Sequence, residues 1–538
     1  MSRPHQSRVP ISRRGFIGAM GVAGAGAVLL GTGALPADAV PQGPRLPGEP
    51  FTLGVASGDP LPESVVLWTR LAPEPLAEDG LGGMPQRRVP VRWEVAADEG
   101  FRQIVRRGTV VATPEMNHSV HPEVWGLQPG REYWYRFRTG SYLSPVGRTR
   151  TAPAIGAHVP QVSLAVASCA NFASGLYTAY GHMADEDVDL VVHVGDYIYE
   201  GGVGNGGVRG LEVPAWLGAE TITLARYRQQ YALYRSDLDL QAAHAAHPWV
   251  VTLDDHEVDN DWADELNGNA NQQEGFLQRR ADAFRAYYEN LPLRASATPQ
   301  GPDMQLYRTL QYGDLLELNV LDTRQYRDDQ PADGGRAAPN PGSLAEDHTM
   351  MGWEQEAWLL DRFDRSRATW QVLANQAPMA ETDMDTGEAV SLFMDPWDGY
   401  DANRRRVLEG AQQRGVENLI VLTGDRHRHH ASNIKADYRD PDAPTMASEY
   451  MCTAISTEGD GADQDGYCRN SLAANPHIKF ANYRRGYVRA TVTPDLWTTD
   501  FRVVPYVSRP GAPISTRATY VTEPGVPGVQ FAGEGPAV

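Results

Sequence analysis

The chain contains almost no lysine, only three cysteines and, beyond its first forty residues, no long apolar run. Of its 48 basic residues only Lys435 and Lys479 are lysines, so a mechanism through a lysine Schiff base is disfavoured. No stretch of about 18 apolar residues follows the N-terminal segment, which argues against a membrane-spanning helix there. We therefore expect a soluble mature protein without a stable membrane anchor.

Positive charge is also in deficit over the chain as a whole. The net charge is −20, from 48 basic and 68 acidic residues. The first 39 residues hold four of the basic residues and one acid, so residues 40–538 hold 44 basic and 67 acidic side chains. A nucleic-acid-binding surface needs clustered positive charge, and none is expected here. The acidic balance suits a soluble enzyme that holds divalent cations.

The N-terminal segment has the layout of an export signal. Arg13 and Arg14 precede Phe16, an apolar Gly/Ala-rich stretch follows, and small residues at 37–39 offer a cleavage site. Adjacent arginines before an apolar stretch indicate a twin-arginine signal over residues 1–39. A membrane anchor is disfavoured because the stretch is short and ends at a small-residue site. We predict a secreted or periplasmic/cell-wall protein that is a partner of the twin-arginine export machinery.

The three cysteines leave two possibilities open. Cys452 and Cys468 lie 16 residues apart in a loop-rich region and could form a disulfide in an oxidising compartment. Cys169 is then the odd cysteine, which marks it as a candidate functional thiolate, with an inert core residue as the alternative.

Residues 48–152 have the pattern of an all-β domain. Alternating apolar and polar residues, separated by turn signals, predict strands at 65–71, 87–96, 108–113, 119–127 and 131–140. The turn and strand of Leu127–Tyr135 resemble those of fibronectin-type sandwiches, so we expect a small β-sandwich. Its expected role is that of a scaffold or lid.

Residues 160–505 alternate strand-like and helix-like segments, which favours an α/β fold with helices layered on sheets. Helical spacing of apolar residues predicts helices at 176–186, 224–246, 276–290, 353–366 and 401–415. Tyr487–Val504 is expected to add two antiparallel strands. The Pro/Gly-rich segment 506–538 is expected to be a tail that winds over the surface or frays.

Six apolar runs in this region end in residues that can bind a metal or act as an acid or base. They have the length and β-branched content of buried strands, and they cover 162–171, 190–200, 248–257, 315–326, 370–379 and 418–430. Ligands of open α/β sheets bind at the carboxyl ends of strands. If these strands share a sheet, one rim gathers these candidates: Cys169, Asp196, Tyr199, Asp255, His256, Asp425 and His427. This arrangement predicts a polynuclear metal site.

The residue types at these strand ends suit hard cations. Asp196 follows a glycine at a sharp turn, where its carboxylate can bridge two cations and neutralise both. Tyr199 could bind as a phenolate, which suits a strong Lewis acid such as Fe³⁺. Asp254 and Asp255 would repel each other without a cation between them. The competing interpretations are a packed loop aromatic for Tyr199 and an exposed acidic turn for the aspartate pair.

Four short motifs occur in an order that resembles the alkaline phosphatase D (PhoD-like) family of metallophosphoesterases. They are Ser168-Cys169, Gly195–Glu200, Asp254–Glu257 and Gly424–His427. The resemblance implies an α/β fold, a four-layer metallophosphoesterase sandwich of two mixed sheets flanked by helices, over 160–505. It also implies that the N-terminal all-β region at 48–152 is a separate fibronectin-like sandwich domain.

The same resemblance implies a site that holds Fe³⁺ and Ca²⁺. By motif, Asp196 is shared between the metals and the iron ligands are Cys169, Asp196, Tyr199 and Asp425. Asp255 and His427 correspond to ligands of the second metal.

His256 and Asp255 are the expected catalytic residues, because His256 matches the histidine that assists the phosphoryl oxygens or the leaving group. Whether Asn260 rather than Asp255 completes the calcium shell stays open, as do the roles of Asp322 and Asn375.

The expected reaction is hydrolysis of phosphoric esters by a metal-activated water, in diesters and monoesters. The phosphate ester substrate would receive a hydrogen bond or proton from His256 at its leaving oxygen. A secreted metal-dependent phospholipase D acting on phospholipid headgroups is the alternative, disfavoured because no amphipathic docking helix is evident. A binding module on a catalytically dead α/β body is disfavoured by the complete ligand set.

Overall fold

The computed structural model describes residues 46–537. The predicted export signal at 1–39 lies outside the described residues. Within the described range, no helix is both long and apolar enough to cross a membrane.

The larger sheet in residues 46–537 has eleven strands and carries three of the predicted runs near its centre. β10 (Val162–Ala167), β11 (Leu190–His193) and β12 (Pro248–Val251) run parallel side by side, so their carboxyl ends share one edge. β1 (Val55–Leu61) extends the parallel set beyond β12, and β22 (Arg485–Val492) pairs antiparallel with β10 on the other side.

The second sheet of the described chain has seven strands and carries the remaining runs. Its parallel strands are β14 (Leu316–Val320), β16 (Trp370–Ala374), β18 (Leu419–Thr423) and β20 (Thr445–Met451). Antiparallel partners complete it: β13 (Arg308–Tyr312), β19 (His429–Lys435) and β21 (Ile478–Asn482). All six predicted runs form strands, but they are divided between two sheets. The second set does not pair with the first, because β22 occupies the free edge of β10 and β1 occupies the free edge of β12.

Helices form at the predicted segments with one exception. They are α1 (Thr178–Ala184), α4 (Phe276–Asn290), α5 (Gly352–Arg365) and α6 (Asp401–Gln413). The segment predicted as one helix at 224–246 is two, α2 (Leu224–Arg235) and α3 (Leu238–Ala246). Asp237 separates them because its carboxylate accepts the backbone N–H groups of Asp239 and Leu240 and starts α3. A further helix, α7 (Gly466–Ala474), lies in the loop-rich region.

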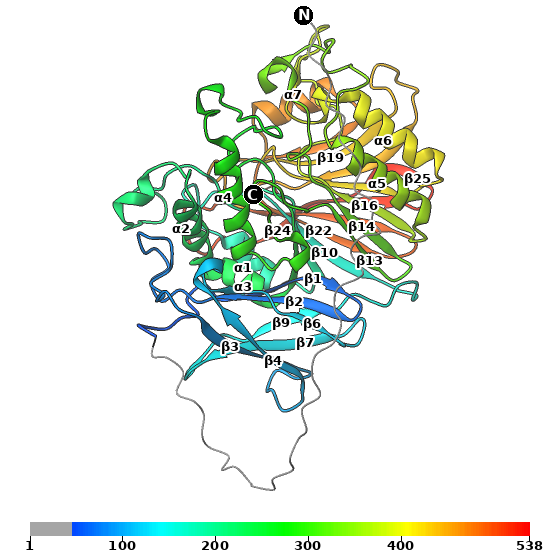
Figure 1. Cartoon of the computed structure of the whole chain (residues 1–538). Helices are drawn as coiled ribbons and strands as arrows, with labels where there is room; N and C mark the ends of the chain where they lie inside the picture. Colours follow the sequence, from blue (N-terminus) through cyan, green and yellow to red (C-terminus); the bar gives the residue numbers. More distant parts are fainter. Residues whose placement is uncertain (1–45, 538) are drawn as a thin grey trace, which may run out of the picture. The chain divides into compact units, whose positions relative to one another are not determined.

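Opposite faces of the strands bury different cores, as the pleat of a strand requires. Leu164 of β10 packs with Leu318 of β14 in a core between the two sheets. The next residue, Ala165, faces the other way and packs with Tyr231 of α2. On the second sheet, Val421 packs with side chains of α5 and α6, which lie beside β14 and β16 in Figure 1. Each sheet thus has helices on its outer face and the other sheet on its inner face.

The N-terminal region is all-β, and its strands are divided between two sheets. One is five-stranded and lies in the blue and cyan part of Figure 1: β3 (Val89–Ala96), β4 (Ile104–Ala112), β7 (Glu132–Thr139), β8 (Tyr142–Leu143) and β9 (Gly147–Arg150). The others add to the larger sheet beside β1: β2 (Ser64–Arg70), β5 (Ser119–Val120) and β6 (Glu123–Trp125). Leu67 and Phe137 share a core between these layers. One layer of this region is therefore an extension of the larger sheet.

The C-terminal segment is not a loose surface tail. β22 and β23 (Trp497–Val504) form the predicted antiparallel pair. β24 (Ser515–Glu523) and β25 (Val526–Glu534) then continue the larger sheet to its edge. Ala518 and Tyr520 on β24 are buried in the core between the sheets. The expectation of a fraying tail is wrong for these residues, because β24 has an alternating buried face that the proline and glycine content obscures.

Two contacts join the sheets where their parallel strands end. Ser168, which follows β10, forms a parallel bridge with Ala454, which follows β20. Gly424, which follows β18, lies against Ser168, and a Cβ atom there would come within 2.5 Å of the serine hydroxyl. The carboxyl ends of strands from both sheets therefore meet in one place.

Candidate metal centre

Four of the predicted ligands lie just after strands in an unusual backbone conformation. The φ angles of Cys169, Asp196, Asp425 and His427 are +58°, +56°, +67° and +55°. Residues other than glycine rarely adopt this left-handed region, and each such residue costs about 1–3 kcal/mol. Strain that recurs at the ends of β10, β11 and β18 indicates that these side chains are held where function needs them.

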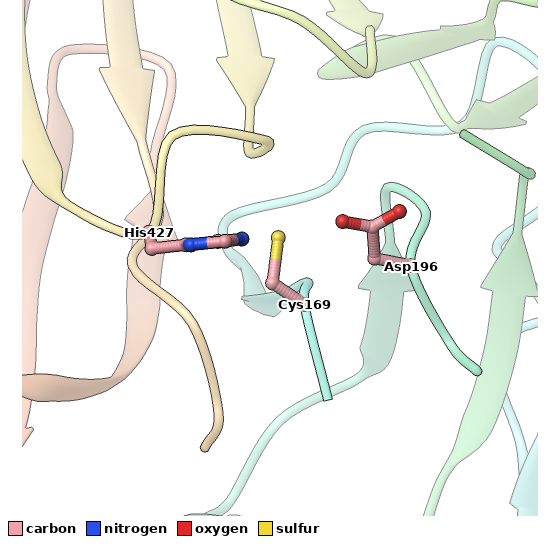
Figure 2. Close-up of side chains that lie close together, drawn as sticks. All are labelled: Cys169, Asp196 and His427. Atoms are coloured by element: carbon pink, nitrogen blue, oxygen red, sulfur yellow. The ribbon is translucent and has the colours of Figure 1, made fainter. Parts of the chain in front are cut away.

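The first group of candidate ligands consists of Cys169, Asp196 and His427. One donor atom from each, the thiol sulfur, a carboxylate oxygen and a ring nitrogen, lies within 4.8 Å of the other two. Figure 2 shows the three side chains directed toward one another, with the sulfur between the imidazole and the carboxylate. Sulfur, nitrogen and oxygen donors that converge in this way suit a transition metal.

Tyr199 belongs to the same group through its hydroxyl. That hydroxyl donates a hydrogen bond to Oδ2 of Asp196 at 3.0 Å and lies 3.1 Å from Nε2 of His427. Thr457 donates its own hydroxyl to the tyrosine oxygen at 3.1 Å. A phenol oxygen with three polar neighbours is more than a packed loop aromatic, and it lies where it could bind the cation that the other donors bind.

Asp196 is shared with a second group, in which its partners are Asp255 and His256. Donor atoms of these three side chains also lie within 4.8 Å of one another. Nδ1 of His256 lies 2.7 Å from Oε2 of Glu200. The Asp255 carboxylate accepts the backbone N–H groups of His256 at 3.0 Å and Asp261 at 2.8 Å. The two groups are adjacent because they have Asp196 in common.

Burial and mutual repulsion dominate the electrostatics of the site. Burial raises the pKa values of Cys169 and Asp196 well above their ordinary values, and Asp196 adds to the shift of the thiol. Burial also opposes the charge of Asp255, but Arg324 and His256 lower its pKa to about 2. Burial alone would lower the pKa of His256, yet Asp255 and Asp196 raise it well above its ordinary value. Acids crowded in this way need positive charge, which a metal ion supplies.

One carboxylate oxygen of Asp196 indicates that the donor set fits a cation. Oδ1 of Asp196 is buried and has no hydrogen-bond partner among the described residues, whereas Oδ2 of Asp425, which also lacks a hydrogen bond, has an ion pair with Arg426. Leaving such an atom unsatisfied costs at least about 1–3 kcal/mol. Buried polar atoms are otherwise almost always paired, so an orphaned oxygen of Asp196 beside a thiol, a phenol and imidazoles indicates ion binding.

Comparison with known proteins places this arrangement in a family. Residues 164–501 match the PhoD-like phosphatase family, and residues 37–153 match the N-terminal domain of PhoD-like phosphatases. The chain is 51% identical over 510 residues to alkaline phosphatase D of Bacillus subtilis (strain 168), with 95% of this chain and 87% of the relative covered. A solved structure titled "Structure of PhoD" matches with a TM-score of 0.88 at 50% identity, over 92% of this chain and 94% of that one.

The chain belongs to the PhoD-like phosphatase family. This confirms the resemblance drawn from the four motifs. It also confirms that the chain is an enzyme of the phosphatase type, and the phospholipase D alternative is not favoured.

In this PhoD-like phosphatase, Asp425 lies at the margin of the site. It belongs to neither group of mutually close donors, and its Oδ2 lies 3.3 Å from Nε of Arg426. The Arg426 guanidinium stacks on the ring of Phe393 at 4.6 Å. Asp425 still contributes to the raised pKa values of Asp196 and Cys169, so it is a near neighbour. The structure thus brings six of the seven predicted side chains into contact and leaves Asp425 beside them.

The residues with open roles have ordinary structural partners. Asn260 is exposed and donates its side-chain amide to Asp261 at 2.7 Å. Asp322 accepts the backbone N–H of Arg324 at 3.1 Å and so holds that loop. Asn375 donates to a backbone carbonyl two residues ahead at 2.7 Å. None of the three belongs to the two donor groups found among the described residues.

Sequence reasoning missed the charged residues that surround the donor groups. Nε of Arg324 lies 2.5 Å from Oδ1 of Asp254, and its Nη1 lies 3.0 Å from Oδ1 of Asp395. Oε2 of Glu458 lies 3.5 Å from Nδ1 of His427. The place of Arg324 just after β14 was a usable signal. Asp395 and Glu458 lie in loops without a motif, and only the folded chain brings them to the site.

The disulfide considered between Cys452 and Cys468 is not formed. Both cysteines are free and buried, and burial raises the pKa of each thiol to about 12. The sulfur of Cys452 lies 3.3 Å from the hydroxyl of Ser168, in the core between the sheets, whereas Cys468 lies on α7. Their spacing in the sequence allowed a pairing that the fold separates.

Proposed function

We infer that this protein is a metal-dependent phosphatase whose reaction takes place where Asp196 joins the two donor groups. Family membership carries the reaction class, hydrolysis of phosphoric esters. The single observation that carries the site assignment is the Asp196 carboxylate, which has close donor neighbours on both sides and one oxygen without a hydrogen-bond partner among residues 46–537.

The donor set supports an iron and a calcium site. Cys169, Asp196 and Tyr199 would hold Fe³⁺, with Asp425 completing the set, because a thiolate and a phenolate suit a strong Lewis acid. By the family pattern, Asp255 and His427 would serve the second cation, Ca²⁺, with Asp196 shared. Calcium prefers carboxylate oxygens, which suits Asp255 and Asp196, whereas the geometry groups His427 with Cys169 and Tyr199 rather than with Asp255.

When bound, such metals supply Lewis-acid polarisation of the phosphoryl oxygens and activation of the attacking water. The chain's own contribution begins with His256. Glu200 fixes one ring nitrogen at 2.7 Å, which sets the ring orientation and leaves the other nitrogen to donate to the leaving oxygen. Asp255 keeps its charge beside this histidine because Arg324 and His256 hold its pKa near 2.

Several finer assignments are proposals that rest on the same family pattern. We propose that the enzyme acts on phosphodiesters and phosphomonoesters and is exported through the twin-arginine pathway to the cell wall, periplasm or medium. We also propose the four-layer sandwich description for 160–505, which is supported by helices outside each sheet and a core between the sheets. A fibronectin-like identity for 48–152 remains a proposal, and the shared sheet argues for a rigid attachment.

Metal analysis combined with substrate comparison tests the proposal. Freshly purified mature protein should contain iron and calcium and be coloured by thiolate- or phenolate-to-iron charge transfer. It should hydrolyse p-nitrophenyl phosphate and bis(p-nitrophenyl) phosphate but not phosphatidylcholine. Removing the metals with a chelator should lower activity by at least about 100-fold, and adding them back should restore it. A colourless, iron-free preparation with full activity would refute the iron assignment.

A further inference from the structure

Glu257 is a buried carboxylate of the Asp254–Glu257 motif that reaches neither donor group. Only 1% of it is exposed, and no ion pair among the described residues includes it. A buried acid without a cationic partner is costly, so its oxygens need other compensation. Its retention at this place calls for a role other than holding a metal.

The oxygens of Glu257 bind the backbones of two separate loops. Oε1 accepts the backbone N–H of Tyr197, in the loop after β11. Oε2 accepts the backbone N–H of Asp254, in the loop after β12, at 2.9 Å. Tyr197 directly follows Asp196, and Asp254 directly precedes Asp255. Glu257 therefore links the residues adjacent to one predicted ligand from each donor group.

The two loops are also in direct contact beside this link. A Cβ atom on Gly195 would come within 2.4 Å of Cβ of Asp254, so only glycine allows this approach. Gly195 has a φ of +111°, which a residue with a side chain rarely adopts. Contact limits how close the loops can come, and the Glu257 hydrogen bonds limit how far they can separate.

We propose that Glu257 is a positioning residue that fixes the spacing between Asp196 and Asp255 and thereby the spacing of the two metal ions. This inference rests on the proposed metal-dependent function. Residues that orient ligands without binding metal themselves change metal affinity or activity by about 10–100-fold when they are replaced. Glu257 acts through its hydrogen bonds to the backbone of both loops, so its replacement should loosen both donor groups together.

The chain offers a matched control in Glu449 of β20. It is also buried, at 2% exposure, and its two oxygens accept backbone N–H groups, from Met379 at 2.6 Å and Ala380 at 3.2 Å. Oε1 also accepts the hydroxyl of Thr423 at 3.3 Å, and none of these partners is directly adjacent to a predicted ligand. The variants Glu257→Gln and Glu449→Gln therefore disturb similar backbone hydrogen bonds, and only the first disturbs those of residues directly adjacent to predicted ligands.

The test measures metal affinity by chelator competition, metal content after dialysis, and thermal stability in wild type and both variants. Both variants should be destabilised, because each turns an accepting oxygen into an amide that faces an N–H donor. Metal affinity should fall about 10–100-fold in Glu257→Gln and stay within about twofold of wild type in Glu449→Gln. If Glu257→Gln does not fold, Glu257→Asp, which keeps the charge but shortens the reach, takes its place with the same expectation.

The outcomes separate this inference from the proposed function. A wild-type protein that binds no metal would refute the proposed metal-dependent function itself. A wild type that binds metal while the Glu257 variant binds it equally tightly would overturn the positioning role alone. Equal losses of affinity in the Glu257 and Glu449 variants would also overturn it, since they would reflect general loosening of the fold.

Discussion

The two sheets contribute opposite kinds of chemistry to the place where they meet. Loops after strands of the larger sheet supply Cys169, Asp196 and Asp255, and within residues 46–537 neither the thiol nor the Asp196 carboxylate has an ion-pair partner. Loops after strands of the second sheet supply guanidinium groups, chiefly Arg324 after β14 and Arg426 after β18. The larger-sheet loops thus supply acids without fixed cations of their own, and the second-sheet loops supply the fixed cations together with Asp395, Asp425 and His427.

This difference shows how the site balances its charge. Burial opposes the ionisation of Asp395, yet Arg324 and Arg327 hold its pKa well below its ordinary value. Asp196 has no such guanidinium partner in the part of the chain that the structure describes, and burial raises its pKa well above its ordinary value. Arg324 and Arg327 therefore compensate the charge of Asp395, and Arg324 also compensates Asp254 and Asp255, while Asp196 needs charge from outside the protein. Metal ions are the natural supply.

The largest effect is expected from replacing Asp196, the acid that both donor groups share. Asp196→Asn keeps the shape but removes the charge, so both metals should be lost and activity should fall by about 10⁴-fold or more. Activity toward p-nitrophenyl phosphate and metal content measure the effect. Asp322→Asn is the control, since this buried acid holds the loop of Arg324 and should leave the metals bound. Substantial activity in Asp196→Asn would argue against a shared ligand.

Removing a fixed cation from the second-sheet loops should affect stability first. The Arg324 side chain is fully buried and serves Asp254, Asp255 and Asp395. Arg324→Met should lower the free energy of unfolding by about 3–5 kcal/mol, because it leaves buried carboxylates unpaired. Urea unfolding measures the change against Arg365→Met, whose ion pair with Asp361 is exposed and worth about 0–1 kcal/mol. Equal losses of unfolding free energy in the two variants would mean that the buried carboxylates around Arg324 do not depend on it for stability.

Replacing His256, which follows β12, should show whether this residue serves the reaction or metal binding. His256→Gln removes the group proposed to assist the leaving oxygen, so kcat should fall about 100-fold while the metals stay bound. Steady-state kinetics and elemental analysis of the same preparation check both parts. Glu200→Gln should have a smaller effect in the same direction, because it loosens the ring without removing it. An unchanged kcat in His256→Gln would place this residue in metal binding or packing only.

Most of the candidate site could be predicted from the sequence, because each candidate ligand follows a recognisable strand. The strands that end near Cys169, Asp196, Asp255 and Asp425 could be predicted because each is a run of apolar, β-branched residues followed by a polar residue. What could not be predicted depends on pairing between distant segments. The division into two sheets follows from β22 taking the edge of β10, and Asp395 reaches Arg324 only through the folded loops. The tail strands β24 and β25 were obscured by proline and glycine, although every second residue of β24 from Ala518 on is buried.

The smallest expected effect concerns the seam between the two sheets, where Cys452 meets Ser168 at 3.3 Å. Because Cys452 and Cys468 are free, dithiothreitol should leave the midpoint of thermal unfolding unchanged. A disulfide between them would contribute about 2–4 kcal/mol, and reduction would remove that stability. Thiol titration of the unfolded mature protein should count three thiols, matching the three free cysteines. A count of one, with a lower midpoint after reduction, would mean that a covalent link draws α7 toward the seam, and the packing of Cys452 between the sheets would need revision.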